Sequence, residues 1–132
     1  MKVIYNKLIP FKGYFAINLF GVMFVREEYK NYNISKQTYN HELIHTSQAL
    51  DFIFKYKQIQ FLGYLIFYVI YFMEWLIKLL ISLFTFGKIK AYRSISFEQE
   101  AYKNQHNLNY LDSRKSFAWV KYIFKVVWRK NT

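Results

Sequence analysis

The residues of this chain best suited to chemistry are two histidines and a glutamate that stand close together. His41, Glu42 and His45 form the pattern H-E-x-x-H, which uses two of the three histidines in the protein. On a helix, residues i and i+4 lie on the same face, so both imidazoles can reach one metal ion. The glutamate then lies next to a metal-bound water, where a general base is needed. The spacing predicts a zinc site with hydrolytic chemistry.

The segment that carries the motif has the features of a helix. Ser35 is a suitable N-cap, and residues 36–57 contain neither glycine nor proline. Gln48 falls one turn after His45, where it can hydrogen-bond a ligand and fix the tautomer of a ligating histidine. Two alternatives stay open: Gln48 is a solvated surface residue, or the helix merely happens to carry two partly exposed histidines.

A catalytic zinc site needs a third protein ligand and one position left for water. The best candidate segment is residues 96–102, SFEQEAY, which carries two glutamates. Glu74 is a rival, because a carboxylate inside an otherwise apolar block is costly unless it is paired or bound. A pair between Glu74 and Lys78 on the same helix would also explain this residue.

The order of these two motifs resembles that of the gluzincin zinc metallopeptidases, and most of all their membrane-embedded branch, which includes the CAAX-processing and quality-control zinc proteases. In that branch the first glutamate of an E-x-x-A-D run is the third ligand. By position the resemblance implies Glu98 as ligand and Ala101 as the small residue. Tyr102 stands where the family has an aspartate that orients a ligating histidine. Three acidic residues are possible substitutes for that aspartate: Asp51, Glu74 and Glu100.

Hydrolysis also needs a hydrogen-bond donor for the developing oxyanion. On a helix Tyr102 would share the face of Glu98, whereas Glu100 would point away from it. We name Tyr102 as a candidate catalytic residue beside Glu42, and also His106, which is less well aligned with this face. Other residues within reach are Arg93, Gln105 and Tyr110.

The composition narrows the class of protein. A chain of 132 residues is long enough for a single domain over residues 1–132. It has no cysteine, which excludes thiolate ligands and thiol catalysis. Nineteen basic against 8 acidic residues and 23% aromatic residues indicate either nucleic acid or an anionic membrane as partner. Because no nucleic-acid-binding motif occurs in the sequence, we expect membrane lipid and no nucleic acid.

Residues 61–86 are almost continuously apolar. As one helix they would be about 40 Å long, enough to cross a bilayer, but too short for two full spans. A single crossing would separate the histidines from Glu98. We therefore expect a shallow hairpin, an in-plane helix or a tilted helix beside the site; the alternative is a core helix of a soluble protein. Polar residues recur along one face of the helix: Gln60, Tyr64, Tyr68, Tyr71, Glu74, Lys78, Ser82 and Thr85.

Two flanking segments complete the expected fold. Residues 13–26, rich in β-branched and aromatic side chains, predict a strand or hairpin. In the zinc peptidases that the chain resembles, such a strand pairs with the substrate backbone. Residues 116–130 predict an amphipathic helix with a basic stripe, lying on an anionic leaflet. The alternative for this segment is an ordinary surface helix.

The sequence thus predicts a mainly α (α+β) protein: a short N-terminal strand or hairpin, an H-E-x-x-H helix, a long apolar helix or helical hairpin, a glutamate-bearing helix and an amphipathic C-terminal helix. We expect a membrane-associated zinc metallopeptidase acting on peptides or membrane proteins. The composition is compatible with a bacterial inner-membrane protein. One alternative is a non-catalytic membrane-surface protein whose structural metal site is closed by a fourth ligand such as His106. The other is a zinc hydrolase of a lipid amide or ester.

Overall fold

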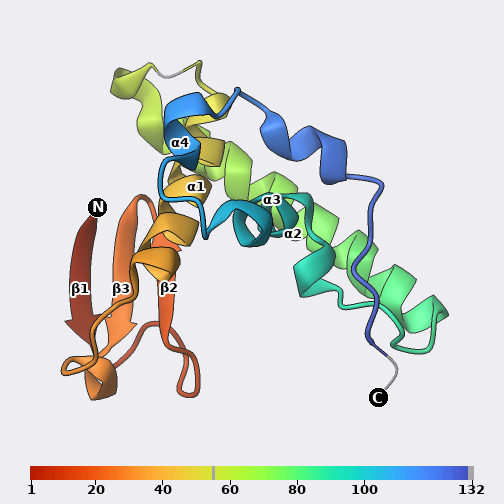
Figure 1. Cartoon of the computed structure of the whole chain (residues 1–132), viewed down its shortest axis with the longest axis horizontal. Helices are drawn as coiled ribbons and strands as arrows, with labels where there is room; N and C mark the ends of the chain where they lie inside the picture. The colour runs from red at the N-terminus through yellow and green to blue at the C-terminus, as the bar shows by residue number, and fades with distance from the viewer. Residues whose placement is uncertain (55, 131–132) are drawn as a thin grey trace.

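The computed structural model describes residues 1–54 and 56–130 (Figure 1). Strands and helices occur in the order β1 (Lys2–Asn6), β2 (Ala16–Leu19), β3 (Val22–Arg26), α1 (Lys36–Asp51), α2 (Gln60–Phe84), α3 (Ser96–Asn104) and α4 (Tyr110–Ser113). Short 3-10 helices cover Glu27–Tyr29, Lys57–Ile59, Tyr92–Ser94 and Ala118–Tyr122. The mainly α (α+β) fold class is confirmed.

The strands of the described residues form one sheet in the order β1-β3-β2. β2 and β3 are antiparallel, and Phe20 and Gly21 form the two-residue turn between them, both with positive φ. A side chain at position 21 would also place its Cβ 2.6 Å from the Tyr64 hydroxyl. The hairpin predicted within residues 13–26 is confirmed, whereas β1, which pairs parallel to β3, had no clear sequence signal.

Helix α1 begins as expected and ends earlier than expected. Ser35 caps it, because its Oγ accepts a hydrogen bond from Thr38 N at 3.0 Å. The expectation of one helix over residues 36–57 is wrong: α1 ends at Asp51, and Phe54 adopts a left-handed φ of 48°. Just after the end of the helix, Ile53 is buried and packs against Gly63 of α2. Lys55 of that expected helix lies outside the described residues.

Helix α2 is one continuous helix of 25 residues, so a hairpin in this segment is wrong. By length and composition it could cross a membrane, and only 17% of its most apolar 18-residue segment is buried. Its buried residues, Gly63, Tyr64, Phe67, Lys78 and Ser82, lie on one side. Helix α1 packs against both α2 and α3, and in Figure 1 α2 extends well beyond the sheet.

The amphipathic helix expected over residues 116–130 is wrong. Only Ala118–Tyr122 of the described segment is helical, as a 3-10 helix; a turn and irregular backbone follow, with Trp128 paired to Ile89. Tertiary contacts override the helical periodicity here. The buried ammonium of Lys78 donates to two backbone carbonyls of this segment, each at 2.7 Å, which fixes its path along α2.

Candidate metal centre

Two helices bring the three predicted ligands together. His41 and His45 come from α1, and Glu98 comes from the first turn of α3. The two histidine Nε2 atoms lie 3.1 Å apart, and each is 3.2 Å from a different carboxylate oxygen of Glu98. Ligand atoms bound to zinc at ~2.0–2.1 Å in a tetrahedron are about 3.3 Å apart. Within the described residues this cluster has the spacing of a metal site.

The hydrogen bonds of Gln48 determine which nitrogen of His45 carries the proton. Gln48 Nε2 donates to the Phe97 carbonyl and to Glu100 Oε2, both at 2.9 Å. Its Oε1 therefore faces His45 Nδ1, 2.8 Å away, and has to accept a hydrogen bond from it. The neutral imidazole of His45 consequently directs the lone pair of Nε2 into the cluster.

His41 is held in the same manner from the other side. Gln105 Oε1 lies 2.9 Å from His41 Nδ1; with Nδ1 as the donor of this hydrogen bond, His41 Nε2 presents a second lone pair facing the first. Glu98 Oε2, fully buried, has no hydrogen-bond partner among the described residues. Three electron-pair donors that face one another in a buried place need a cation between them. The residues present fit a zinc ion.

Without a metal, a proton meets this need. Burial alone would lower the pKa of His45, but the Glu98 carboxylate outweighs burial and raises that pKa to about 9. Burial alone would raise the pKa of Glu98, but the two imidazoles lower it well below its usual range. An imidazolium–carboxylate pair thus occupies the position that suits a divalent cation, and binding of that cation would release the proton.

A buried ion-pair network supports Gln48 from behind. Arg114 Nη2 lies 2.8 Å from Asp51 Oδ2, and Arg114 Nε lies 2.5 Å from Glu100 Oε1. All three side chains are at most 3% exposed. The network runs from Arg114 through Glu100 and Gln48 to His45. Of the acidic residues considered from the sequence as orienting groups, Glu100 accepts a hydrogen bond from Gln48, and Asp51 lies on the other side of Arg114, two ion pairs from Glu100.

Glu74, the rival ligand, lies outside the cluster and caps α3 instead. Its two oxygens accept hydrogen bonds from Ser96 N at 2.8 Å and Ser96 Oγ at 2.6 Å. A carboxylate at this end of a helix satisfies free N–H groups and complements the helix dipole. The expected Glu74–Lys78 pair does not explain it, because Lys78 donates to backbone carbonyls. Glu74 therefore positions the turn of α3 that carries Glu98.

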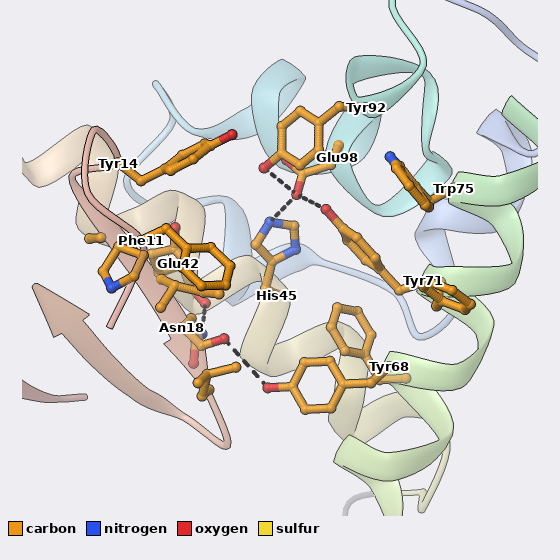
Figure 2. A pocket seen from close by; sticks show the side chains of 16 residues that line it. Phe11, Tyr14, Asn18, Glu42, His45, Tyr68, Tyr71, Trp75, Tyr92 and Glu98 are labelled. Atoms are coloured by element: carbon orange, nitrogen blue, oxygen red, sulfur yellow. Dashed lines mark hydrogen bonds and ion pairs between the residues drawn. The ribbon is translucent and has the colours of Figure 1, made fainter. Parts of the chain in front are cut away.

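A cavity of about 700 Å³ opens onto one side of the cluster. Glu42, His45 and Glu98 lie in its wall, while most of the remaining lining is aromatic or aliphatic. In Figure 2, Phe11 and Tyr14 lie on one side of the cavity and residues of α2 on the other. Burial raises the pKa of Glu42, although the two imidazoles oppose this effect.

Two tyrosines that were not predicted as site residues from the sequence donate hydrogen bonds to the Glu98 carboxylate. Tyr71 and Tyr92 hydroxyls lie 2.8 Å and 2.9 Å from Glu98 Oε1, and both line the cavity (Figure 2). Burial raises the pKa of Tyr92 and keeps its hydroxyl a donor. Tyr71 belonged to the polar face predicted for the apolar helix. Tyr92 lies in a short 3-10 turn, and its sequence context carried no signal.

The other two predicted catalytic residues, Tyr102 and His106, have different surroundings. The Tyr102 ring packs edge-on against His41, with centroids 4.6 Å apart, and the Arg93 guanidinium lies 3.6 Å from its centre. His106 is exposed, with its Nε2 3.2 Å from Gln37 Nε2. Because α3 ends at Asn104, His106 turns away from the cluster. Neither is among the described residues that line the cavity.

Comparison of the chain with models of protein families, with curated proteins and with solved structures gives no match. The resemblance to the gluzincin peptidases therefore stays a prediction. Functional assignment rests on the cluster of His41, His45 and Glu98, on Glu42 beside it, and on the cavity that both face.

Proposed function

We propose that the protein is a membrane-associated zinc hydrolase that cleaves peptide bonds. The observation that carries this proposal is the convergence of two imidazole lone pairs and an unpartnered carboxylate oxygen beside Glu42, at the wall of a cavity. A zinc ion held by His41, His45 and Glu98 would supply a Lewis acid and lower the pKa of water to about 7. Three protein ligands leave a position for that water.

Glu42 is the general base in this proposal. It accepts a proton from the attacking water as the water oxygen bonds to the peptide carbon. It then donates this proton to the leaving nitrogen as the C–N bond breaks. Its raised pKa suits both steps, because proton transfer is most efficient when the pKa approaches the working pH. Tyr71 and Tyr92 line the cavity and would serve the oxyanion by turning their hydroxyl hydrogens to it from Glu98 Oε1, and Tyr102 is the competing candidate.

The edge of the sheet supports a peptide as substrate. β2 is an edge strand of the described sheet, and its residues line the cavity. Asn18 Nδ2 donates to the Glu42 carbonyl at 2.9 Å, which fixes the strand relative to the general base. The Tyr68 hydroxyl hydrogen-bonds the backbone of Asn18 and Phe20, at the end of β2 next to the turn. A substrate strand would therefore pair with the other end of β2, near Ala16.

The surface of α2 supports the membrane association. Large apolar side chains along it are about half exposed or more, among them Leu62, Val69, Met73, Ile77, Leu80 and Leu83. Soluble monomers rarely expose a continuous apolar face of this length. The net charge of +11 favours an anionic bilayer as the partner.

The second candidate is a hydrolase of a lipid amide or ester, favoured by the size and apolar lining of the cavity. A closed structural metal site has less support, because His106, the fourth ligand that it was expected to use, lies on the surface. The two hydrolase candidates share the metal centre and differ in the scissile group. Substrate profiling with peptides and with lipid amides and esters separates them.

The test of the proposal compares wild type with Glu42→Gln, and with Asp112→Asn as a matched control on an exposed acid. Each protein is purified in detergent, loaded with zinc, and assayed for zinc content and for cleavage of quenched fluorescent peptides. We expect Glu42→Gln to retain zinc and lose cleavage, while Asp112→Asn retains both. Cleavage by Glu42→Gln at the wild-type rate would contradict the role of Glu42.

A further inference from the structure

In the loop between β1 and β2, residues 7–14 present most of their apolar side chains outward. Leu8 is 82% exposed, Phe11 is 83% exposed and Tyr14 is 66% exposed. Single exposed apolar residues are common on protein surfaces, but a cluster in one short loop indicates a contact with another apolar phase.

Polar groups hold this loop in a fixed shape from the inside. Asn6 Oδ1 accepts hydrogen bonds from Leu8 N at 2.8 Å and from Ile9 N at 2.7 Å. The Arg26 guanidinium of β3 donates to two further loop carbonyls. Because these hydrogen bonds hold the loop backbone against the protein, the outward orientation of its apolar side chains is fixed by the fold.

The exposed face of α2 is the second apolar surface. The polar side chains of α2 bond to the body of the protein along most of its length, from Tyr68 at the sheet to Ser82 at Ile89. If α2 crossed a bilayer, α3 beside it would lie at membrane depth together with its exposed Lys103, which is costly. A helix covered along most of its length on one side and bare on the other suits the plane of the membrane surface.

The two surfaces meet at the cavity. Phe11 and Tyr14 of the loop and Phe72 of α2, which is 57% exposed, all line it. Figure 2 shows the loop residues across the cavity from Tyr71 and Trp75 of α2. The rim of the cavity is therefore apolar and exposed on both sides.

The charges of the loop indicate the kind of bilayer. Lys7 and Lys12 flank Phe11 and are exposed. Lys7 lies 3.8 Å from Glu27 with its side chain 82% exposed, a weak pair that leaves the ammonium accessible. Apolar side chains between lysines suit insertion among anionic headgroups, since each basic residue near such a surface adds attraction.

We propose that loop 7–14 and the exposed face of α2 form one docking surface on an anionic bilayer. α2 lies parallel to the membrane plane, and the mouth of the cavity opens into the lipid between the loop and the helix. As far as the substrate is concerned, this inference rests on the proposed function: the scissile segment reaches Glu42 from the bilayer.

The absence of cysteine from the chain allows a direct test, because each single-cysteine variant carries one fluorescent label. The labelled positions are Phe11→Cys in the loop, Leu62→Cys, Met73→Cys and Leu83→Cys along α2, and Asn107→Cys as an exposed control. The variants bind vesicles of phosphatidylcholine with or without phosphatidylglycerol. Quenching by spin-labelled lipids of known depth is compared with quenching by aqueous iodide.

We expect the labels at Phe11, Leu62, Met73 and Leu83 to report one similar shallow depth, protected from iodide, and the label at Asn107 to report water. Leu62 and Leu83 are about 32 Å apart along the helix axis. Labels there in opposite leaflets would overturn the in-plane placement. A label at Phe11 quenched by iodide, with the α2 labels in lipid, would overturn the role of the loop. Equal binding to vesicles with and without phosphatidylglycerol would contradict an anionic bilayer as the partner.

A partition measurement without labels gives an independent check. Phe11→Ser should lower the vesicle partition coefficient about tenfold or more. Tyr32→Ser, at a site 65% exposed and outside the loop, should leave it unchanged. Equal partition of Phe11→Ser and wild type would contradict the docking surface. None of these readouts involves metal or catalysis, so a failure to bind zinc would refute the proposed function and leave this inference standing.

Discussion

Replacing Gln48 by Met removes the group that orients His45 and keeps a buried side chain of similar length. In the structure Gln48 is 0% exposed, with Oε1 2.8 Å from His45 Nδ1 and Nε2 2.9 Å from Glu100 Oε2. The substitution leaves the Nδ1–H of His45 without an acceptor and frees the imidazole to turn. We therefore expect Gln48→Met to weaken zinc binding while the three ligands remain.

The loss of a hydrogen-bond partner behind a metal-ligating histidine costs about 10–100-fold in metal affinity. That corresponds to about 1.4–2.7 kcal/mol, within the range for a buried donor left unsatisfied. The assay is a competition titration with a chromogenic zinc chelator, in detergent and at fixed pH. Gln99→Met is the matched control, because Gln99 of α3 donates to backbone carbonyls such as that of Ser94 at 2.8 Å.

The reasoning would be refuted by a zinc dissociation constant of Gln48→Met equal to that of wild type. An equal weakening in Gln99→Met would also contradict it, because the effect would then come from general loosening of α3. An intact far-ultraviolet circular dichroism spectrum and a single elution peak in both variants establish that the comparison is between folded proteins.

Three further predictions concern the surroundings of the site. Arg114→Met leaves the buried Asp51 and Glu100 unpaired, so it should cost about 3–5 kcal/mol and lower the melting temperature by about 10–18 °C, and a shift below a few degrees would contradict the network. Tyr92→Phe should lower kcat about 10²–10³-fold if its hydroxyl serves the oxyanion, and a larger loss in Tyr102→Phe would move that role to Tyr102. The pKa of His45 is raised from 6.5 to about 9 in the metal-free protein, so its stabilising contribution is complete below pH 6.5 and is lost as pH rises through 9. The melting-temperature difference between zinc-loaded and chelator-treated protein should therefore widen from pH 6.5 to 9, and a constant difference would contradict it.

The parts of the fold that the sequence predicts are those set by local rules. Ser35 before a run without helix breakers predicts the start of α1, and the i, i+4 spacing of His41 and His45 places both on one face. The polar residues along one face of α2 form a periodic pattern, and two of them, Tyr68 and Tyr71, line the cavity beside the site. The β-branched and aromatic side chains of residues 13–26 likewise predict a strand or hairpin there.

The features that the sequence does not predict depend on contacts between distant segments. Ile53 packs on Gly63 just past the end of α1, and hydrogen bonds from Lys78 hold the non-helical C-terminal segment along α2. Arg114 acts through two acids far from it in the chain, and Tyr92 approaches Glu98 only because the turn before α3 folds back. Periodicity contains no information about such pairings, so local reasoning assigned 116–130 to a helix and missed Tyr92.

The zinc content of the loaded, detergent-purified protein tests the central claim most directly. Wild type is measured beside His45→Ala and Glu98→Gln, with Glu74→Gln as the matched carboxylate that caps α3 and lies outside the cluster. We predict one zinc per chain in wild type and Glu74→Gln, and none in His45→Ala and Glu98→Gln. Wild type without zinc, or full zinc content in Glu98→Gln, would contradict the metal centre on which the proposed hydrolase depends.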